Sequence, residues 1–253
     1  MEHGSLTESA AASANLRHTY VSIAKAILGS VITHENGFDI CVGPYPHPVC
    51  NFAVNLKLNV SEAGDLARRA ATAESFNVYS MPGDEPAHLR TLLERYGFVQ
   101  TQTLVQMVAN GKLVAGGLDL ERLVDLPGRE DLARFMTDQF FHRQTSSFRR
   151  RLGSATARAT NLELLAFRQG GAIEAGAMLS ETEEMLGIYN VCVTPEKRGM
   201  GFGTTLIQAL LQRAESRGKP ATLQCEALMQ DWYERHGFRA TGYVEVFSLS
   251  KTQ

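Results

Sequence analysis

The stretch NVCVTPEKRGMGFGTTLIQALL, residues 190–211, reads as a strand, a turn with three alternating glycines, and a helix. The glycines are Gly199, Gly201 and Gly203. A helix N-terminus presents unpaired N–H groups and the positive end of the helix dipole. Because glycine lacks a Cβ, such a turn lets the backbone approach a bound anion closely. We therefore expect this turn to bind a diphosphate.

Three kinds of phosphate-binding turn compete for this glycine pattern. The nucleoside-triphosphate loop ends in Gly-Lys-Ser/Thr, but here Thr204 follows Gly203 without a lysine. The dinucleotide fingerprint needs a later third glycine and an acidic residue at the end of the next strand, and neither is present. The third pattern, Arg/Gln-x-x-Gly-x-Gly/Ala, is matched by Arg198, Gly201 and Gly203. Glycines placed for steric reasons alone remain an alternative.

The residues around the turn predict an α/β domain with a mixed sheet. Apolar periodicity and turn residues indicate the following order of elements. They are a strand at 118–126, helices at 129–141 and 145–157, a strand hairpin at 162–181 turning at Gly170-Gly171, a strand at 184–193, the glycine turn, a helix at 204–218, a strand at 221–227, a short helix at 228–237 and a last strand at 243–250.

The N-terminal half predicts a second series of elements. Residues 1–14 are small and polar, so we expect a disordered tail there. The elements that follow are a helix at 15–29, strands at 38–43 and 51–58, a helix at 61–75 with Ser61 as N-cap, a strand at 76–81, a helix ending near Tyr96 and a strand at 98–108. Residues 109–117 have the composition of a linker. We therefore predict two lobes, 15–112 and 117–253.

The two halves also share a local sequence match. LERYGFVQTQTLVQM (93–107) aligns with YERHGFRATGYVEVF (233–247) at a constant offset of 140. A Gly-Phe pair after a helix can arise by chance, because glycine suits the position that ends a helix. The similar flanking elements favour an internal duplication. The first copy has no glycine turn, and it has Leu93 where the second has Tyr233.

Composition limits the classes of function. The 253 residues carry a formal charge of −2, which gives no general attraction to nucleic acid or to an anionic membrane. The four cysteines have no metal-ligand spacing and the chain does not need disulfides, so we expect reduced thiols and no metal. No stretch has the length and apolar character of a membrane span or a secretory signal. We therefore expect a cytoplasmic protein that binds neither nucleic acid nor membrane.

The segment NVCVTPEKRGMGFGTTLIQALLQRAESRGKPATLQCEALMQDWYERHGFRATGY (190–243) resembles the acetyl-coenzyme A binding core of the GCN5-related N-acetyltransferase (GNAT) family. The resemblance extends over residues 117–253 and is most specific from Ile188 to Phe238. It implies the acyl-CoA N-acyltransferase fold and acetyl-CoA as co-substrate. The first half resembles a degenerate copy of that fold, and the whole chain resembles the tandem, two-lobed members of the family.

The resemblance also implies which residues bind the cofactor. The pantetheine arm would lie along the strand before the glycine turn, and the pyrophosphate would be held by the turn itself. An N–H group of that strand could also stabilise the oxyanion formed when an amine attacks the thioester. The implied set is Val191, Cys192 and Val193 on the strand, Arg198, Gly199, Met200, Gly201, Phe202, Gly203 and Thr204 in the turn, and Gln224 on the following strand.

The implied catalytic acid is Tyr233, four residues before Gly237. A phenol with an ordinary pKa near 10 stays protonated at neutral pH and can donate to a departing thiolate. A packing role beside Trp232 is the alternative. For the base, the resemblance points to Glu184, with Glu183 and Glu226 also open; acidic residues at strand ends are usually solvated.

The sequence thus predicts an enzyme that transfers an acetyl group from acetyl-CoA directly to a primary amine. A catalytically silent acyl-CoA-binding regulator is the alternative. The acceptor, a small molecule or a peptide, cannot be read from the sequence, and a homodimer is compatible with it. The basic residues Arg149, Arg150, Arg151 and Arg158 could favour an acidic acceptor or could form a solvated helix face.

Overall fold

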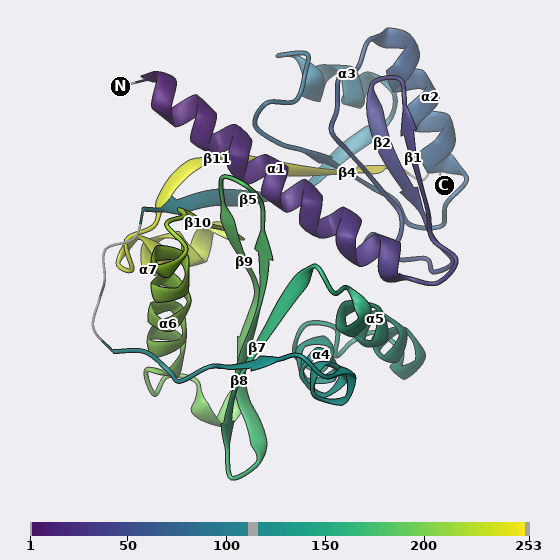
Figure 1. The fold of residues 1–253 in the computed structure, drawn as a ribbon. Helices are drawn as coiled ribbons and strands as arrows, with labels where there is room; N and C mark the ends of the chain where they lie inside the picture. The colour runs from purple at the N-terminus through teal and green to yellow at the C-terminus, as the bar shows by residue number, and fades with distance from the viewer. Residues whose placement is uncertain (1, 111–115, 251–253) are drawn as a thin grey trace.

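The computed structural model describes residues 2–110 and 116–250, and these form one mixed sheet with helices on both faces (Figure 1). The sheet has eleven strands in the described residues, in the order β1-β2-β3-β4-β11-β5-β10-β9-β8-β7-β6. The α/β class with a mixed sheet is therefore confirmed. Most of the predicted linker, residues 111–115, lies outside the described residues.

The N-terminal half supplies α1 to β5. Its elements are α1 (Glu2–Ala26), β1 (Val31–Glu35), β2 (Phe38–Val42), β3 (Phe52–Val54), α2 (Val60–Ala71), β4 (Asn77–Ser80), α3 (Leu89–Arg95) and β5 (Phe98–Ala109). The C-terminal half supplies β6 (Glu121–Leu123), α4 (Leu126–Phe140), α5 (Ser146–Arg158), β7 (Leu162–Gln169), β8 (Ala172–Glu181), β9 (Leu186–Val193), α6 (Phe202–Ser216), β10 (Ala221–Cys225), α7 (Gln230–Glu234) and β11 (Arg239–Leu249).

Alternate residues of strand β5 show which helices cover which face of the sheet. Val105 and Met107 pack in a core cluster with α6, whereas Leu104 packs in the cluster of α1. Neighbouring residues of a strand point to opposite faces, so α1 and α6 lie on opposite sides of the sheet. Helices α4 and α5 share a cluster with the end of α1, and α2 and α3 cover the other face of the N-terminal strands.

The two halves exchange a strand at the centre of the sheet. Strand β11, from the C-terminal half, pairs antiparallel with β4 of the N-terminal half. Strand β5, from the N-terminal half, pairs antiparallel with β10 of the C-terminal half. The two exchanged strands also pair with each other over their whole length. The predicted division at residues 112–117 therefore runs between two halves that share one continuous sheet.

The register of the exchanged strands relates to the sequence match at offset 140. In the β5–β11 ladder Leu104 lies opposite Val244, and these two residues are 140 apart. Two copies of one strand that cross at equivalent residues are related by a local two-fold axis. The strand orientations on the two sides of this point also match. In the series β2-β3-β4-β11-β5 the successive pairs are antiparallel, parallel, antiparallel and antiparallel. The series β8-β9-β10-β5-β11 has the same four orientations in the same order.

The structure corrects the expected disordered tail over residues 1–14. Helix α1 begins at Glu2, and Ser13 is fully buried. The Ser13 hydroxyl donates to Gln106 Oε1 at 3.1 Å, and Gln106 Nε2 donates to the carbonyl of Ser9 at 2.9 Å. Small side chains let α1 lie close on the sheet, but they give no apolar stripe, so the segment resembles a tail in the sequence.

Two smaller expectations in the N-terminal half are also wrong. Asn59, not Ser61, caps α2. The Asn59 side chain accepts hydrogen bonds from the Ser61 and Glu62 amides, and the Glu62 carboxylate accepts one from the Asn59 amide. Strand β3 ends at Val54 rather than residue 58, because Asn55 adopts a left-handed conformation with φ of 58°. The apolar residues continue to alternate at Leu56 and Leu58, after the backbone has turned, and this misled the prediction.

We predict that residues 117–253 do not fold into a soluble monomer alone. Without β5, the edges of β10 and β11 would be unpaired, and unpaired edges promote self-association. Expressed separately, the fragment should aggregate or self-associate; co-expressed with residues 1–110, it should form a soluble one-to-one complex. Size-exclusion chromatography with light scattering measures this. A monomeric 117–253 that unfolds cooperatively would show that the exchange is dispensable.

Candidate active site

The glycine turn joins the end of β9 to the start of α6. After Val193, residues Pro195–Lys197 make one turn of 3₁₀-helix, and α6 begins at Phe202. Gly199 and Gly201 have φ of 74° and 84°, in the left-handed region that favours glycine. A Cβ at either position would meet no atom within 4 Å. The turn is therefore a left-handed path whose outer side is open, at a helix N-terminus without a side-chain cap.

Two cations flank this turn. Arg198 donates from Nε to the Val193 carbonyl at 3.2 Å and from Nη2 to Gln139 Oε1 at 2.7 Å. Lys197 Nζ lies 3.0 Å from Gln169 Oε1 and 5.3 Å from the centre of the Phe202 ring. Neither cation forms an ion pair with a carboxylate in the described part of the chain. Their charge is available to an anion at the turn.

The remaining turn residues have different environments. Met200 is 67% exposed at the outer side of the turn. A Cβ on Gly203 would lie 3.6 Å from Trp232 Cζ2, an ordinary packing distance, so a small side chain would fit there. Thr204 Oγ1 lies 3.4 Å from Nε2 of His236. None of the three glycines is therefore required by a clash of its Cβ with neighbouring atoms; Gly199 and Gly201 are favoured by their positive φ.

Strands β9 and β10 enclose a wedge that opens toward the glycine turn. Within the described residues these parallel strands pair only at Leu186–Ala221 and Gly187–Thr222. Beyond that point β10 stays with β5, while β9 follows β8. Asn190 has a φ of 50°, and the β8–β9 register shifts beside it. The backbone of β9 is therefore distorted in the middle of the wedge, as is common next to functional sites.

The predicted cofactor-strand residues line this wedge. Val191 and Val193 pack toward the cluster of α6, whereas Cys192 is 7% exposed and packs toward α4 and α5. Burial raises the pKa of the Cys192 thiol to about 12, so it is neutral at physiological pH. Gln224, on β10, is partly buried, and its side chain interacts with the Tyr189 hydroxyl. The role of these four residues in cofactor binding stays a prediction.

Tyr233 lies at the same end of the wedge as the glycine turn. It follows the C-terminal end of β10, on α7, and packs edge-on against Trp232 at 4.8 Å and Phe238 at 5.6 Å between ring centres. Burial, with a smaller effect of nearby Cys225, raises the pKa of Tyr233 to about 12. Its phenol is therefore protonated at neutral pH and can act as a proton donor.

Glu184 and the glycine turn lie at opposite ends of the wedge. Glu184 is exposed in the turn before β9, next to the pair Leu186–Ala221 that closes the wedge. The eight residues of β9 separate it from the glycine turn by about 25 Å at 3.3 Å per residue. Glu183 occupies the same turn. Glu226 directly follows β10 and is the one of the three that lies at the end carrying Tyr233.

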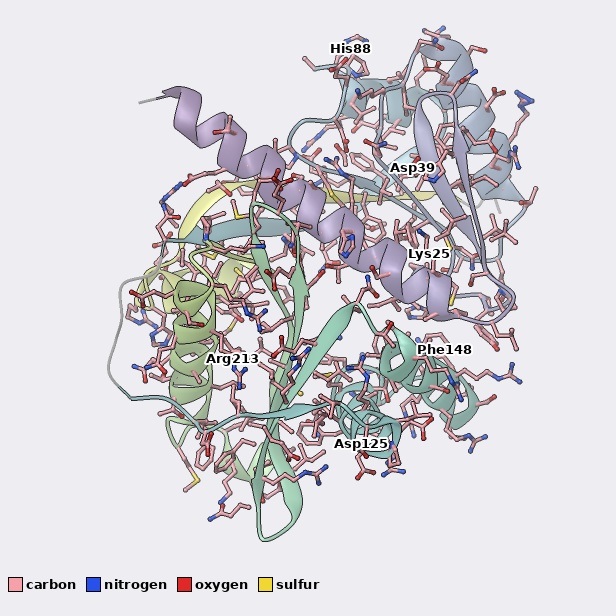
Figure 2. All side chains as sticks on the ribbon, viewed as in Figure 1. Lys25, Asp39, His88, Asp125, Phe148 and Arg213 are labelled. Atoms are coloured by element: carbon pink, nitrogen blue, oxygen red, sulfur yellow. The ribbon has the colours of Figure 1, made fainter. Side chains whose placement is uncertain are left out.

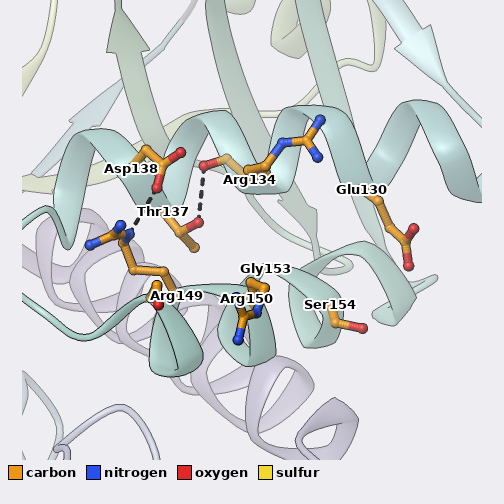
Figure 3. Close-up of a pocket in the computed structure, with 9 residues that line it drawn as sticks. Glu130, Arg134, Thr137, Asp138, Arg149, Arg150, Gly153 and Ser154 are labelled. Atoms are coloured by element: carbon orange, nitrogen blue, oxygen red, sulfur yellow. Dashed lines mark hydrogen bonds and ion pairs between the residues drawn. The ribbon is translucent and has the colours of Figure 1, made fainter.

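The basic residues of α5 form a solvated helix face with local partners. Figure 3 shows Arg149 and Arg150 in a groove between α4 and α5, with a volume of about 410 Å³. Arg149 pairs with Asp138 at 2.8 Å and donates to the Gln144 carbonyl. Arg158 pairs with Glu130, and Arg151 with the hydroxyl of Tyr45. Carboxylates thus pair with two of the four arginines, and these surface pairs favour the solvated-face interpretation over an acidic acceptor.

The region between α1 and the C-terminal half is filled by side chains that the sequence analysis did not assign. Phe148, labelled on α5 in Figure 2, belongs to a cluster with Ile23 and Ile27 from the end of α1. Closer to the wedge, the Tyr189 hydroxyl donates to Asn15 Oδ1 at 2.7 Å. Asn15 fell in the helix expected from residue 15, but nothing in the sequence signalled its contact with β9. Asn190 could have been suspected, since asparagine is enriched in left-handed conformations.

The N-terminal half has the corresponding parallel pair, but its wedge is tied shut. Beyond the β3–β4 pairs, the Asp84 carboxylate accepts from the Leu56 amide at 3.1 Å and from the Met81 amide at 2.8 Å. Across the same gap, the Leu58 amide donates to the Glu85 carbonyl and the Glu85 amide donates to the Leu56 carbonyl, both at 2.9 Å. Arg17 of α1 pairs with Asp84 at 3.1 Å. The space that stays open in the C-terminal half is thus crossed by hydrogen bonds here.

The C-terminal half matches a known family model. The model of the acetyltransferase (GNAT) family matches residues 129–238, which include most of α4, the glycine turn and Tyr233. The match supports a relationship of this segment to GNAT acetyltransferases. The single mixed sheet is consistent with the acyl-CoA N-acyltransferase fold. No curated protein matches the chain significantly.

Solved structures agree on the fold over most of the chain. A GCN5-related N-acetyltransferase from Kribbella flavida superposes with a TM-score of 0.68 at 13% identity, covering 96% of each chain. One from Sphaerobacter thermophilus gives 0.54 at 16%, covering 83% of this chain and 79% of that one. A tandem GNAT protein from the clavulanic acid biosynthesis pathway gives 0.58 at 12%, covering 86% and 80%. At these identities the similarity concerns the fold alone.

Two further observations concern the described residues. None of their helices has the length and apolar character needed to cross a membrane. Among the same residues, no group of three or more His, Cys, Asp or Glu side chains is arranged to hold a metal ion.

We predict that Asp84 makes stability fall as pH rises through about 6. Burial raises the pKa of Asp84 from 3.8 to about 6, so the folded protein binds this proton more tightly than the unfolded chain. The site favours folding below about pH 4 and loses that contribution as it ionises. Relative to Asp84→Asn, the wild type should lose about 3 kcal/mol of unfolding free energy between pH 4 and 7. Denaturant titrations at several pH values measure the difference. A constant difference would contradict the burial argument.

Proposed function

We propose that this protein transfers an acetyl group from acetyl-CoA to a primary amine. The observation that carries the proposal is the continuity of the site: the open glycine turn leads directly into the β9–β10 wedge, and Tyr233 lies at the same end. A phosphate-binding turn, a slot between parallel strands and a protonated phenol are the three features that a thioester with a long phosphorylated arm would use. The acceptor, a small amine or a peptide, is left open.

In this proposal the cofactor is held mainly by backbone. The turn and α6 N-terminus would bind the pyrophosphate, with the charges of Lys197 and Arg198 beside it. The pantetheine arm would lie along Val191, Cys192 and Val193, and the distortion at Asn190 would leave strand N–H groups facing the thioester. The turn residues concerned are Arg198, Gly199, Met200, Gly201, Phe202, Gly203 and Thr204.

The chemistry is a direct transfer. The amine nitrogen attacks the thioester carbonyl, the new C–N bond forms, and the C–S bond breaks. Tyr233 gives its proton to the departing thiolate, and the proton of the amine goes to a base. Three carboxylates are candidates for that base. Glu183 and Glu184 lie before β9, at the closed end of the wedge, and Glu226 directly follows β10 and could act directly or through water.

We further propose that the chain is a duplicated, two-lobed member of the family. The offset-140 pairing of Leu104 with Val244, the matching strand order and the left-handed asparagines that follow both parallel pairs, Asn55 and Asn190, support a duplication. The bonds of Asp84 across the first wedge support a single cofactor site per chain. The four cysteines are free and buried, which supports a reducing compartment such as the cytoplasm.

We predict that one acetyl-CoA binds per chain and that Gly201→Val abolishes binding. A β-branched residue resists the positive φ at this position and projects into the space that the pyrophosphate needs. Gly218→Val is the matched control: Gly218 has a φ of 65° and open surroundings, but it lies past the other end of α6. Calorimetry should show loss of binding in the first variant only. Equal affinity in both variants would remove the turn from the cofactor site.

We predict that Tyr233→Phe slows acetyl transfer about a hundredfold or more while acetyl-CoA affinity changes little. Phenylalanine keeps the ring contacts with Trp232 and Phe238, so only the donated proton is lost. Single-turnover measurement with an active amine isolates the chemical step from product release. An unchanged chemical step would make Tyr233 a packing residue. Binding without turnover on any amine of a broad panel would instead indicate a silent acyl-CoA-binding protein.

A further inference from the structure

The wedge between β9 and β10 has a closed end as well as an open one. The glycine turn marks the open end, because β9 runs directly into it at Val193. The paired residues Gly187 and Thr222 mark the closed end, where the two backbones are held in one sheet. A cofactor whose phosphates lie at the turn and whose arm runs back along β9 directs its acyl group toward the closed end.

The ring of Tyr189 covers this closed end on the side of α1. A Cβ built on Gly187 would lie 2.3 Å from Tyr189 Cε2 and 2.8 Å from Cζ, so the ring folds back directly over the last paired residue of β9. The same Cβ would lie 2.0 Å from Asn15 Oδ1. Glycine at position 187 is therefore required by the ring and by α1. Tyr189 is half-buried, so part of its surface still borders accessible space.

The position of the Tyr189 ring is fixed by α1. Its hydroxyl donates to Asn15 Oδ1 at 2.7 Å. The other end of the Asn15 amide donates to the carbonyls of Ser180, at 2.9 Å, and Met185, at 3.2 Å. Asn15 is fully buried and bound at both ends, so it holds the phenol in one place.

The other directions are also blocked. On the opposite face of the sheet, Ile188 and Leu223 are buried in the core cluster under α6. On the side of β10, the partly buried Gln224 side chain lies close enough to interact with the Tyr189 hydroxyl. An acyl chain that extended beyond its second carbon would have to enter hydrogen-bonded backbone, a packed core or the Tyr189 ring.

We propose that Tyr189 is a specificity-determining residue: its ring, held by Asn15, ends the acyl site and restricts the donor to short acyl groups such as acetyl. This inference rests on the proposed function, since it takes the wedge as the acyl-CoA site. The ring acts by volume, so the residue is not a catalytic group, and its effect is on the choice among acyl-CoA donors rather than on the acceptor.

The test compares acetyl-, butanoyl- and hexanoyl-CoA as donors to one active amine. The wild-type protein should discriminate strongly against the longer chains, because each methylene that does not fit a pocket is worth roughly tenfold or more in kcat/KM. Tyr189→Ala, which removes the ring, should raise the butanoyl-to-acetyl ratio of kcat/KM at least tenfold. Tyr189→Phe keeps the ring and loses only the polar contacts of the hydroxyl with Asn15, Thr19 and Gln224, so its ratio should stay within about twofold of the wild type.

The outcomes separate the two proposals. If calorimetry finds that no acyl-CoA binds the wild-type protein, the proposed function fails. If acetyl-CoA binds but butanoyl-CoA is used equally well, only the role of Tyr189 fails. If Tyr189→Phe raised the butanoyl-to-acetyl ratio of kcat/KM as much as Tyr189→Ala does, the steric role of the ring would also be overturned. Should Tyr189→Ala not fold, Tyr189→Leu, which retains most of the buried apolar area, tests the same ratio, and the wild-type chain-length series decides without any variant.

Discussion

The pairing of β5 with β11 is the constraint on which the rest of the structure depends. Each strand belongs by sequence to one half and pairs on its outer side with the other half, so the sheet has no internal edge between the halves. Because strand pairing is satisfied only in the assembled chain, neither half contains all the neighbours that its own strands need. The candidate site therefore lies in the C-terminal half but is completed by the N-terminal half, since β10 is held in place by β5.

This arrangement explains how β9 and β10 can separate without loss of the sheet. Strand β10 takes its hydrogen bonds from β5 on one side, from Ala221–Ala109 to Cys225–Val105, and β9 takes its bonds from β8. Each strand of the wedge thus has a firm partner away from the gap. A space between parallel strands would otherwise expose two rows of unpaired backbone groups, and in the N-terminal half those groups are satisfied by Asp84 and by bonds between Leu56 and Glu85. In the C-terminal half, within the described residues, strand pairing between β9 and β10 ends at Gly187–Thr222.

The sequence predicted local features better than the features that come from distant contacts. The hairpin at Gly170-Gly171, the glycine turn and the order of most helices and strands were readable because each has its own periodicity or turn chemistry, whereas strand β1 was missed. The start of α1 was missed because its burial relies on Ser9, Ser13 and Gln106 rather than on apolar residues. The strand exchange was not expected either. The offset-140 match indicated two copies of a strand, but a sequence match cannot show which neighbour each copy pairs with. The same holds for the candidate site. The glycine turn and Tyr233 were predicted from a sequence motif, whereas the contact between Asn15 and Tyr189 depends on tertiary packing.

Helix α1 contacts the wedges of the two similar halves differently. It crosses the sheet near the local two-fold axis, with Arg17 reaching Asp84 in one half and Asn15 reaching Tyr189 in the other (Figure 1). A single helix that crosses a two-fold axis cannot present the same residues to both sides, so it imposes a difference on whatever symmetry the strands have. On the N-terminal side it contributes a cation that compensates a buried carboxylate, and this carboxylate ties the wedge shut. On the C-terminal side it contributes a neutral amide that holds one ring at the closed end and leaves the rest of the wedge open. The difference between the wedges comes mainly from residues outside α1, since the glycine turn and the bonds of Asp84 belong to one half each. Helix α1 adds to it, because residues two positions apart on that helix contact different wedges.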